Sequence, residues 1–410
     1  MSFFGSKVLK KRYGAIIDIG SGSVLAAIVC SNPASKHPQV LWSKREHIPL
    51  RNIDTLEKSA KAVMTSLINT AMELDSIGMK ALREFDAKAE IKEIQCSISA
   101  PWSYTVTKTI HYTQEKPFEV NDSLIQELLL SIQHKIEEEL SKNEALNDLG
   151  LEIITKYNLG ISANGYQVAH PEGNEASTLT VSQATVVAQT YLIDSITQVQ
   201  EKMLPKATVR KLSFVLLFHF INKQLLLRTQ DTCLVDITYE ATEIGIVRDG
   251  ILSYCTHTPF GSFSLAREIS AVTKMPLNES FGHIHAENPY LFLEKLPEKQ
   301  KDDILAIFES YVVKMSDLFK ETGDALSIPK HITLHTDIKT EPLFSDLLEK
   351  AAKRNLKTAP YIVPISQEII NTIYKAVTKD TALVIPTDTA LLISAQFFHT
   401  HQNKDSFRYF

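Results

Sequence analysis

The sequence lacks the features that would assign it to several familiar classes of protein. Its four cysteines, Cys30, Cys96, Cys233 and Cys255, include no Cys-x-x-Cys pair, so we expect reduced, buried thiols and a cytoplasmic location. No apolar run approaches the ~20 residues of a membrane helix. The most apolar stretch, FVLLFHFI from Phe214, has the length of a strand. No P-loop and no Gly-x-Ser-x-Gly elbow occurs.

The bulk composition is that of a globular protein with more than one lobe. The 410 residues are 44% hydrophobic and 22% charged, close to ordinary averages, and they are too many for one core. The formal net charge of −5 disfavours a general role on nucleic acid or anionic lipid. We therefore expect neither a nucleic-acid partner nor a direct membrane span.

Two hairpins carry the clearest local signal. Each begins with an apolar strand that ends at an aspartate, Asp18 in IIDIGSGS and Asp236 in LVDITYEA. After a short turn each continues as a second strand, and the second hairpin ends at the Asp249-Gly250 turn. Aligned on the aspartates, the two stretches indicate either a duplicated unit or a chance likeness of two strands.

Between the hairpins, stretches of strand alternate with helical patterns. Apolar residues at steps of three and four predict helices over 54–85, from about 121 or 122, over 194–203, through 304–315 and from about 387. A strand-helix-strand-strand module over about 100–190 interrupts this alternation. The pattern indicates an α/β architecture. The tight SAPW turn at Ser99–Trp102 is either core packing at the root of the module or an edge that faces a partner.

In order and content these elements resemble the actin/Hsp70-like ATPase fold. The inserted module is similar to the SHS2-type 1C subdomain of the FtsA and PilM proteins, and the start, MSFFGSK…YGAIIDIGSGSV, is similar to that of PilM-type chains. The resemblance implies a two-lobed fold, duplicated and ribonuclease H-like. It implies these domains: 1–100, first part of lobe 1; 101–190, inserted subdomain; 191–230, second part of lobe 1; 231–385, lobe 2; 386–410, closing helix and tail.

The resemblance also implies a nucleotide site with magnesium. Asp18 would face the phosphates, and the first phosphate turn would consist of Gly20, Ser21, Gly22 and Ser23. Asp236 would start the second phosphate turn, and Gly261 matches a glycine of the segment that joins the lobes. The family continues after the second aspartate with glycines, whereas this chain has Thr238, Tyr239, Glu240 and Ala241; where the family has a Gly-Gly pair in the adenosine motif, this chain has His335 and Thr336.

These departures predict a degenerate nucleotide site. Glycines let the backbone approach a phosphate closely, whereas Tyr239 is bulky and Glu240 would repel a polyphosphate. We expect no catalytic residue, no ATP hydrolysis, and ATP and Mg²⁺ bound weakly or not at all. The His283/His285 and His399/His401 pairs lack the further ligands that a metal site needs, so no metal site is expected.

The resulting functional hypothesis is a cytoplasmic adaptor of a membrane-attached machine. PilM-type proteins imply a role in type IV pilus assembly; an FtsA-type role in division and a weak but active ATPase are the alternatives. The closing segment FFHTHQNKDSFRYF is a poor amphipathic helix. This disfavours an FtsA-type membrane anchor and favours the hypothesis of pilus assembly. The implied partner is the cytoplasmic tail of a bitopic inner-membrane protein, bound between the first lobe and the insert, and a homo-oligomer is possible. The alternating strand from Tyr104, with Lys108, is a candidate sheet edge.

Overall fold

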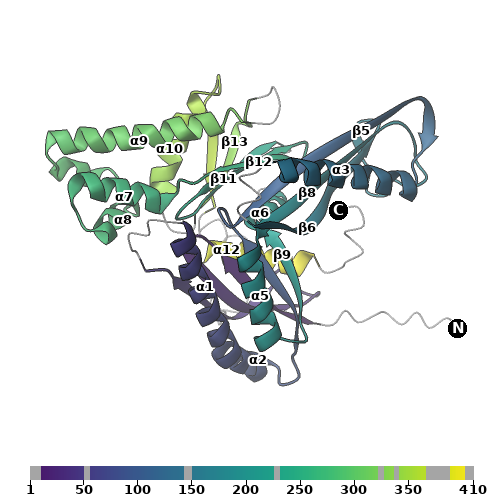
Figure 1. The fold of residues 1–410 in the computed structure, drawn as a ribbon, viewed down its shortest axis with the longest axis horizontal. Coiled ribbons are helices and arrows are strands. Elements are labelled where there is room, and N and C mark those ends of the chain that lie inside the picture. Colours follow the sequence, from purple (N-terminus) through teal and green to yellow (C-terminus); the bar gives the residue numbers. More distant parts are fainter. Residues whose placement is uncertain are drawn as a thin grey trace.

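The described strands form three sheets in three bodies. The computed structural model describes residues 11–49, 56–142, 150–225, 231–321, 327–336, 341–365 and 388–401. Figure 1 shows two helix-covered lobes, with a third sheet that projects to one side. Parts of the expected domains, including the tail after residue 401, lie outside the described residues. Within the described ranges, no helix is both long and apolar enough to cross a membrane.

The first sheet carries the first aspartate hairpin. Its order is β3-β2-β1-β4-β9. Its strands are β1 (Arg12–Ile19), β2 (Ser23–Ser31), β3 (Gln39–His47), β4 (Ile91–Ile98) and β9 (Thr208–Ser213). One face packs on α1 (Leu56–Glu73), a π-helical turn (Leu74–Gly78), α2 (Met79–Phe85) and α5 (Thr190–Met203). The other face packs on α12 (Thr389–Thr400), so the last described helix closes the first lobe.

The second sheet repeats this pattern. Its order is β12-β11-β10-β13-β14, with β10 (Thr232–Ile237), β11 (Thr242–Arg248), β12 (Ile251–Thr258), β13 (His331–Thr336) and β14 (Tyr361–Pro364). β10 is antiparallel to β11 and parallel to β13, as β1 is to β2 and β4. This shared topology favours a duplicated unit over a chance likeness of two strands. One face is covered by α7 (Ser262–Thr273), α8 (Leu277–Ile284), a 3₁₀ turn (Leu291–Lys295), α9 (Glu298–Leu318) and α10 (Glu341–Lys353).

The apolar stretch from Phe214 is a helix and not the strand that its length indicated. It forms α6 (Phe214–Leu225), which packs between the second sheet and α12. A helix buried on several sides is apolar all round and has no amphipathic period. Periodicity alone cannot separate such a helix from a buried strand, which explains the wrong prediction.

The inserted segment has a sheet of its own. β5 (Ser103–Glu119), β6 (Leu151–Ala163), β7 (Tyr166–Gln167) and β8 (Glu175–Gln189) pair in the order β5-β8-β6-β7. α3 (Asp122–Lys142) packs its apolar side on one face. This helix begins where the sequence predicts, because the Asn121 Oδ1 accepts a hydrogen bond from the Leu124 N–H at 2.9 Å. β5 lies at the edge of the sheet, which confirms the edge position predicted from its alternating pattern.

Candidate functional site

The two aspartate turns lie against each other where the lobes meet. Each turn is closed by the same type of bond: the Gly20 N–H donates to the Ser23 carbonyl at 3.0 Å, and the Thr238 N–H donates to the Ala241 carbonyl at 2.9 Å. The sequence alignment of the two hairpins therefore reflects a real structural correspondence. Two facing turns of this kind are the arrangement that could hold a polyphosphate between them.

The second turn packs closely against the first. The Tyr239 ring lies directly over Gly22, where a Cβ atom would come within 2.1 Å of the ring. The Ser21 hydroxyl donates to Thr238 Oγ1 at 2.8 Å and accepts from the Glu240 N–H at 2.9 Å. Gly22 thus allows a close approach, as a phosphate turn requires, but the group that approaches is a tyrosine of the same chain.

A very small cavity lies between the turns. It has a volume of about 10 Å³ and is bordered by both turns, by Phe263 and by residues near Ile48. A cavity of this size holds about one water molecule. This cavity is therefore too small for a phosphate group.

Glu240 is neutralised by an arginine of the second lobe. Both carboxylate oxygens accept hydrogen bonds from Arg267, at 2.8 and 2.6 Å, in the two-pronged geometry of a strong ion pair. Its charge is thus turned toward Arg267 on α7. Gly261 comes directly before this helix, and a Cβ atom there would lie 2.2 Å from the Thr238 carbonyl oxygen. Gly261 therefore lets the start of α7 pack against the second turn.

Asp18 is held by an internal cation. The Arg45 guanidinium, on β3, donates to Asp18 Oδ2 at 2.9 Å, to Ser23 Oγ at 2.7 Å and to both oxygens of Asp388. The other Asp18 oxygen accepts from Ser97 Oγ at 2.7 Å. Burial alone would raise the pKa of Asp388, but Arg45 and the Leu391 N–H lower it below its usual range. Arg45 thus places a positive charge directly beside Asp18.

Asp236 is held by His335, which lies on β13. His335 Nδ1 lies 2.7 Å from Asp236 Oδ1, and His335 Nε2 lies 3.0 Å from Thr389 Oγ1 at the start of α12. Both the histidine and the aspartate are almost fully buried. His335 therefore ties the second aspartate to the helix that closes the first lobe.

A second buried carboxyl group, Glu243, lies beside Asp236, and no ion pair of it occurs among the described residues. Glu243 is directly opposite Asp236 in the β10–β11 ladder, and Glu243 Oε2 and Asp236 Oδ2 both lack a hydrogen-bond partner. Burial and the neighbouring Asp236 raise the pKa of Glu243 well above its usual range, against the lowering effect of the Ala100 N–H. Burial likewise raises the pKa of Asp236, although His335 opposes this.

The segment Ser99–Trp102, at the start of the insert, packs against the first turn. The Trp102 indole is buried and donates to the Gly20 carbonyl at 3.0 Å, and the Ser99 N–H donates to the Ile19 carbonyl at 3.0 Å. The SAPW segment is therefore core packing and not a partner-facing edge. It ties the insert to the first turn.

The structure brings all the predicted site residues together at the meeting point of the lobes. Asp18, Gly20, Ser21, Gly22 and Ser23 form one wall, and Asp236 and Gly261 belong to the other. Sequence reasoning missed Arg45 and Asp388, which have no motif around them. Neither a spacing nor a residue pattern connects two side chains 343 positions apart. Among the described residues, no group of histidine, cysteine and carboxylate side chains could hold a metal ion.

Comparison with known proteins bears on the fold. No family model matches the chain, and no curated protein sequence matches it. A solved PilM–PilN type IV pilus biogenesis complex is similar at a TM-score of 0.57, with 12% identity over 95% of this chain and 98% of the other. The chain has the actin-like ATPase fold. The ethanolamine utilization protein EutJ from Carboxydothermus hydrogenoformans gives a TM-score of 0.45 and 9% identity, over 96% of this chain and 91% of the other.

Replacing Arg45 should destabilise the protein strongly. Arg45→Ala leaves Asp18 and Asp388 without their shared counter-charge, and removal of one partner from a buried ion pair costs about 3–5 kcal/mol. Lys44→Ala removes the neighbouring, exposed pair with Glu73 (3.3 Å), which is worth less than about 1 kcal/mol. Urea denaturation of both variants measures the difference. Equal stability of the two variants would show that Arg45 is not a structural cation.

Gly261→Ala should loosen the packing between α7 and the second turn. The added methyl group would collide with backbone atoms of Thr238 and Tyr239, and overpacking of this kind costs about 1–3 kcal/mol. Gly282→Ala is the matched control, because nothing lies within 4 Å of a Cβ atom at that helical position. Thermal unfolding should show a lower melting temperature for the first variant only.

The buried Glu243 should make stability depend on pH. Because its pKa is raised in the folded state, the unfolded chain loses the proton first. Stability therefore falls as the pH rises above about 4.3, with a slope of up to about 1.4 kcal/mol per pH unit. Glu243→Gln cannot ionise, so its advantage in unfolding free energy over wild type should grow from pH 4.5 to 8. Glu175→Gln, at an exposed position, controls for loss of one charge; a pH-independent difference for Glu243→Gln would contradict the account.

Proposed function

We propose that this chain is an adaptor of the FtsA/PilM type that works without nucleotide turnover. Within an actin-like fold, the observation that carries the proposal is the occupied phosphate site: Tyr239 fills the space over Gly22, and Arg45 holds Asp18. A protein whose own side chains take the places of phosphate and cation has no evident use for ATP hydrolysis. The fold must then serve another purpose, and binding is the simplest one.

The separate inserted sheet supports assignment to the type with an SHS2-like subdomain. Four strands and α3 form their own small core on the chain between β4 and α5, as the resemblance implies. The PilM–PilN complex covers nearly the whole chain in the structural comparison. We therefore place the protein in the cytoplasm, at a type IV pilus or similar membrane machine, where it binds the cytoplasmic tail of a bitopic membrane protein.

Such an adaptor would bind its partner independently of nucleotide if its two lobes were fixed relative to each other. Ser21 bonds both Thr238 and Glu240 across the boundary between the lobes, and α12 is tied to both Arg45 and His335 through consecutive residues, Asp388 and Thr389. Opening the lobes would break these bonds and expose buried charge, which is unfavourable. The partner surface is then presented in one state.

The test measures binding of the partner's cytoplasmic tail in the presence and absence of ATP. We expect the protein to capture the immobilised cytoplasmic tail of the bitopic membrane protein encoded next to its gene, to the same extent with and without 1 mM Mg-ATP. Calorimetry should give an ATP dissociation constant no tighter than ~0.1 mM, so that ATP stabilises the protein by at most about 1.4 kcal/mol. Micromolar ATP affinity, steady-state hydrolysis or nucleotide-dependent capture would favour a working ATPase instead.

A further inference from the structure

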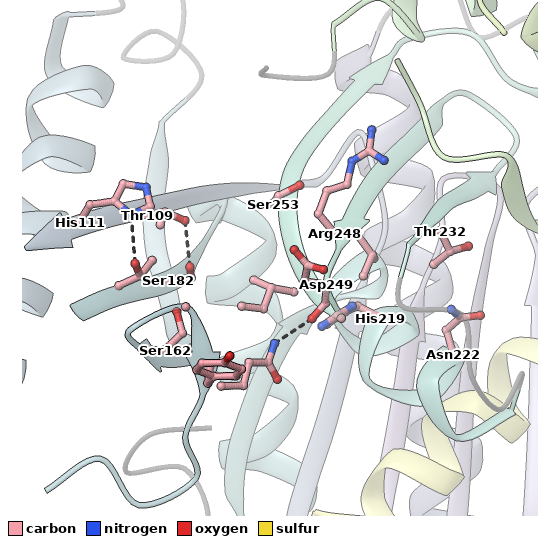
Figure 2. A pocket seen from close by; sticks show the side chains of 17 residues that line it. Thr109, His111, Ser162, Ser182, His219, Asn222, Thr232, Arg248, Asp249 and Ser253 are labelled. Atoms are coloured by element: carbon pink, nitrogen blue, oxygen red, sulfur yellow. Dashed lines mark hydrogen bonds between the residues drawn. The ribbon is translucent and has the colours of Figure 1, made fainter. Parts of the chain in front are cut away.

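A large cavity lies away from the aspartate turns, between the inserted sheet and the second lobe. Its volume is about 970 Å³, near the upper end of the ~300–1,000 Å³ range of small-molecule sites. Figure 2 shows His111 and Ser162 of the insert on one side and Asp249 and Ser253 of the second lobe on the other. The lining includes no residue of the first sheet, so this cavity is distinct from the meeting point of the two aspartate turns.

One row of polar side chains crosses the wall that the insert contributes. In the strand register, His111 of β5 lies opposite Thr180 of β8. Thr180 also lies opposite Ser162 of β6, and Ser162 lies opposite Gln167 of β7. Directly opposite residues lie on the same face of a sheet, and all four belong to the lining. Each of the four strands therefore contributes one hydrogen-bonding side chain to a single line across the cavity wall.

The next row on the same face is also polar. Thr109 lies opposite Ser182, and their hydroxyl oxygens are 2.9 Å apart. Val106 and Ile110 turn to the other face, where they pack with α3. The strands thus bury apolar side chains on one side and present polar ones on the other, as expected of a sheet with one solvated face. Here that polar face borders a cavity closed by the second lobe.

Several groups of the polar row are available to a ligand. His111 Nδ1 lies 3.0 Å from Thr180 Oγ1, and Gln167 Nε2 donates to the Asp249 carbonyl at 2.8 Å. Among the described residues, no hydrogen bond uses His111 Nε2, Gln167 Oε1 or the hydroxyl of the half-buried Ser162. These three groups can bond a ligand without breaking a bond of the protein.

Two tight turns border the cavity and fix its shape. Asn164-Gly165 joins β6 to β7, and Asp249-Gly250 joins β11 to β12; all four residues have positive φ, as two-residue hairpin turns of this kind require. The bond from Gln167 to the Asp249 carbonyl connects the two hairpins. The cavity is therefore formed before a ligand binds, which lowers the entropic cost of binding.

The charges of the lining favour a neutral ligand. Its two residues with permanent charge, Arg248 and Asp249, have opposite signs. Arg248 already contacts Asp231 at 3.5 Å and the Ser327 carbonyl, so it is not free to pair with a phosphate or carboxylate group. Asp249 is exposed, so water and salt screen its charge.

The spacing of the row matches a ligand with several hydroxyl groups. Neighbouring strands are about 4.8 Å apart, so successive side chains of the row are separated by a distance close to the width of a sugar ring. Hydroxyl, imidazole and amide side chains together offer donors and acceptors, and a sugar hydroxyl can pair with either. A peptide that adds to a sheet pairs with the main chain of an edge strand, whereas this wall is the face of a sheet.

We propose that the cavity is a binding site for a neutral saccharide. The sugar hydroxyl groups bond the Ser162 hydroxyl, His111 Nε2 and Gln167 Oε1, and the volume admits more than one sugar ring. The inference goes beyond the proposed function, because the membrane-protein tail is expected between the first lobe and the insert and does not need this cavity. It gives the chain a second ligand.

The test first screens the full chain, fluorescently labelled, on an array of immobilised saccharides. We expect retention on neutral oligosaccharides and weaker retention on uronic acids and sugar phosphates. The best retained saccharide is then titrated against wild type and variants by calorimetry. Ser162→Ala removes one free hydroxyl and should weaken binding about fivefold, the effect of one neutral hydrogen bond. Thr180→Arg places a long side chain in the middle of the row and should weaken binding by about tenfold or more.

The matched control is Thr178→Arg, which lies two positions away on β8, on the same face of the sheet and outside the lining. It should bind the saccharide as wild type does. Retention of no neutral saccharide, or equal binding by all four proteins, overturns the inference and leaves the adaptor proposal standing.

Capture of the membrane-protein tail separates the two proposals. It should be the same for Thr180→Arg and Thr178→Arg; a loss in Thr180→Arg alone would assign the cavity to the tail and overturn the saccharide site. Failure of wild type to capture the tail overturns the adaptor proposal alone. If Thr180→Arg unfolds, which circular dichroism would reveal, Ser162→Ala decides the outcome.

Discussion

The guanidinium of Arg45 is the contact on which the centre of this molecule depends. Three oxygen-bearing side chains converge on it, Asp18 and Ser23 at the first turn and Asp388 at the start of the closing helix. Two carboxylates so close together and largely buried would repel each other strongly without a cation. A planar group with five N–H donors can serve both at once in fixed directions. The first turn, the first sheet and the closing helix are therefore held in register by one side chain.

In the second lobe, buried carboxylates are likewise paired with basic side chains of the same chain. Glu240 is matched by Arg267, and Asp236 is matched by His335. Glycines usually keep such a region open, and here larger side chains of the chain itself occupy it. These side chains form part of the interface between the two lobes.

Much of the architecture could be read from the sequence because it rests on local rules. The aspartate hairpins, the cap at Asn121 and the start of the last helix at Asp388 depend on residues within a few positions of one another. The helix from Phe214 could not be recognised, because burial on several sides removes the periodic signal. Arg45 could not be connected with Asp388, nor Asp236 with His335. Those relations exist only after distant elements pack, and a single sequence carries no trace of them.

The place of α12 has a consequence for the order in which the chain folds. This helix covers the face of the first sheet that presents Ile16, Leu25 and Val29. Those residues are synthesised more than 340 positions before Asp388, which caps the start of the helix and contacts Arg45. Contacts between such distant positions form slowly, because a long loop must close first. During synthesis the first sheet keeps an uncovered apolar face until α12 has been made. The N-terminal lobe of this protein is thus among the first parts to be made and among the last to be finished.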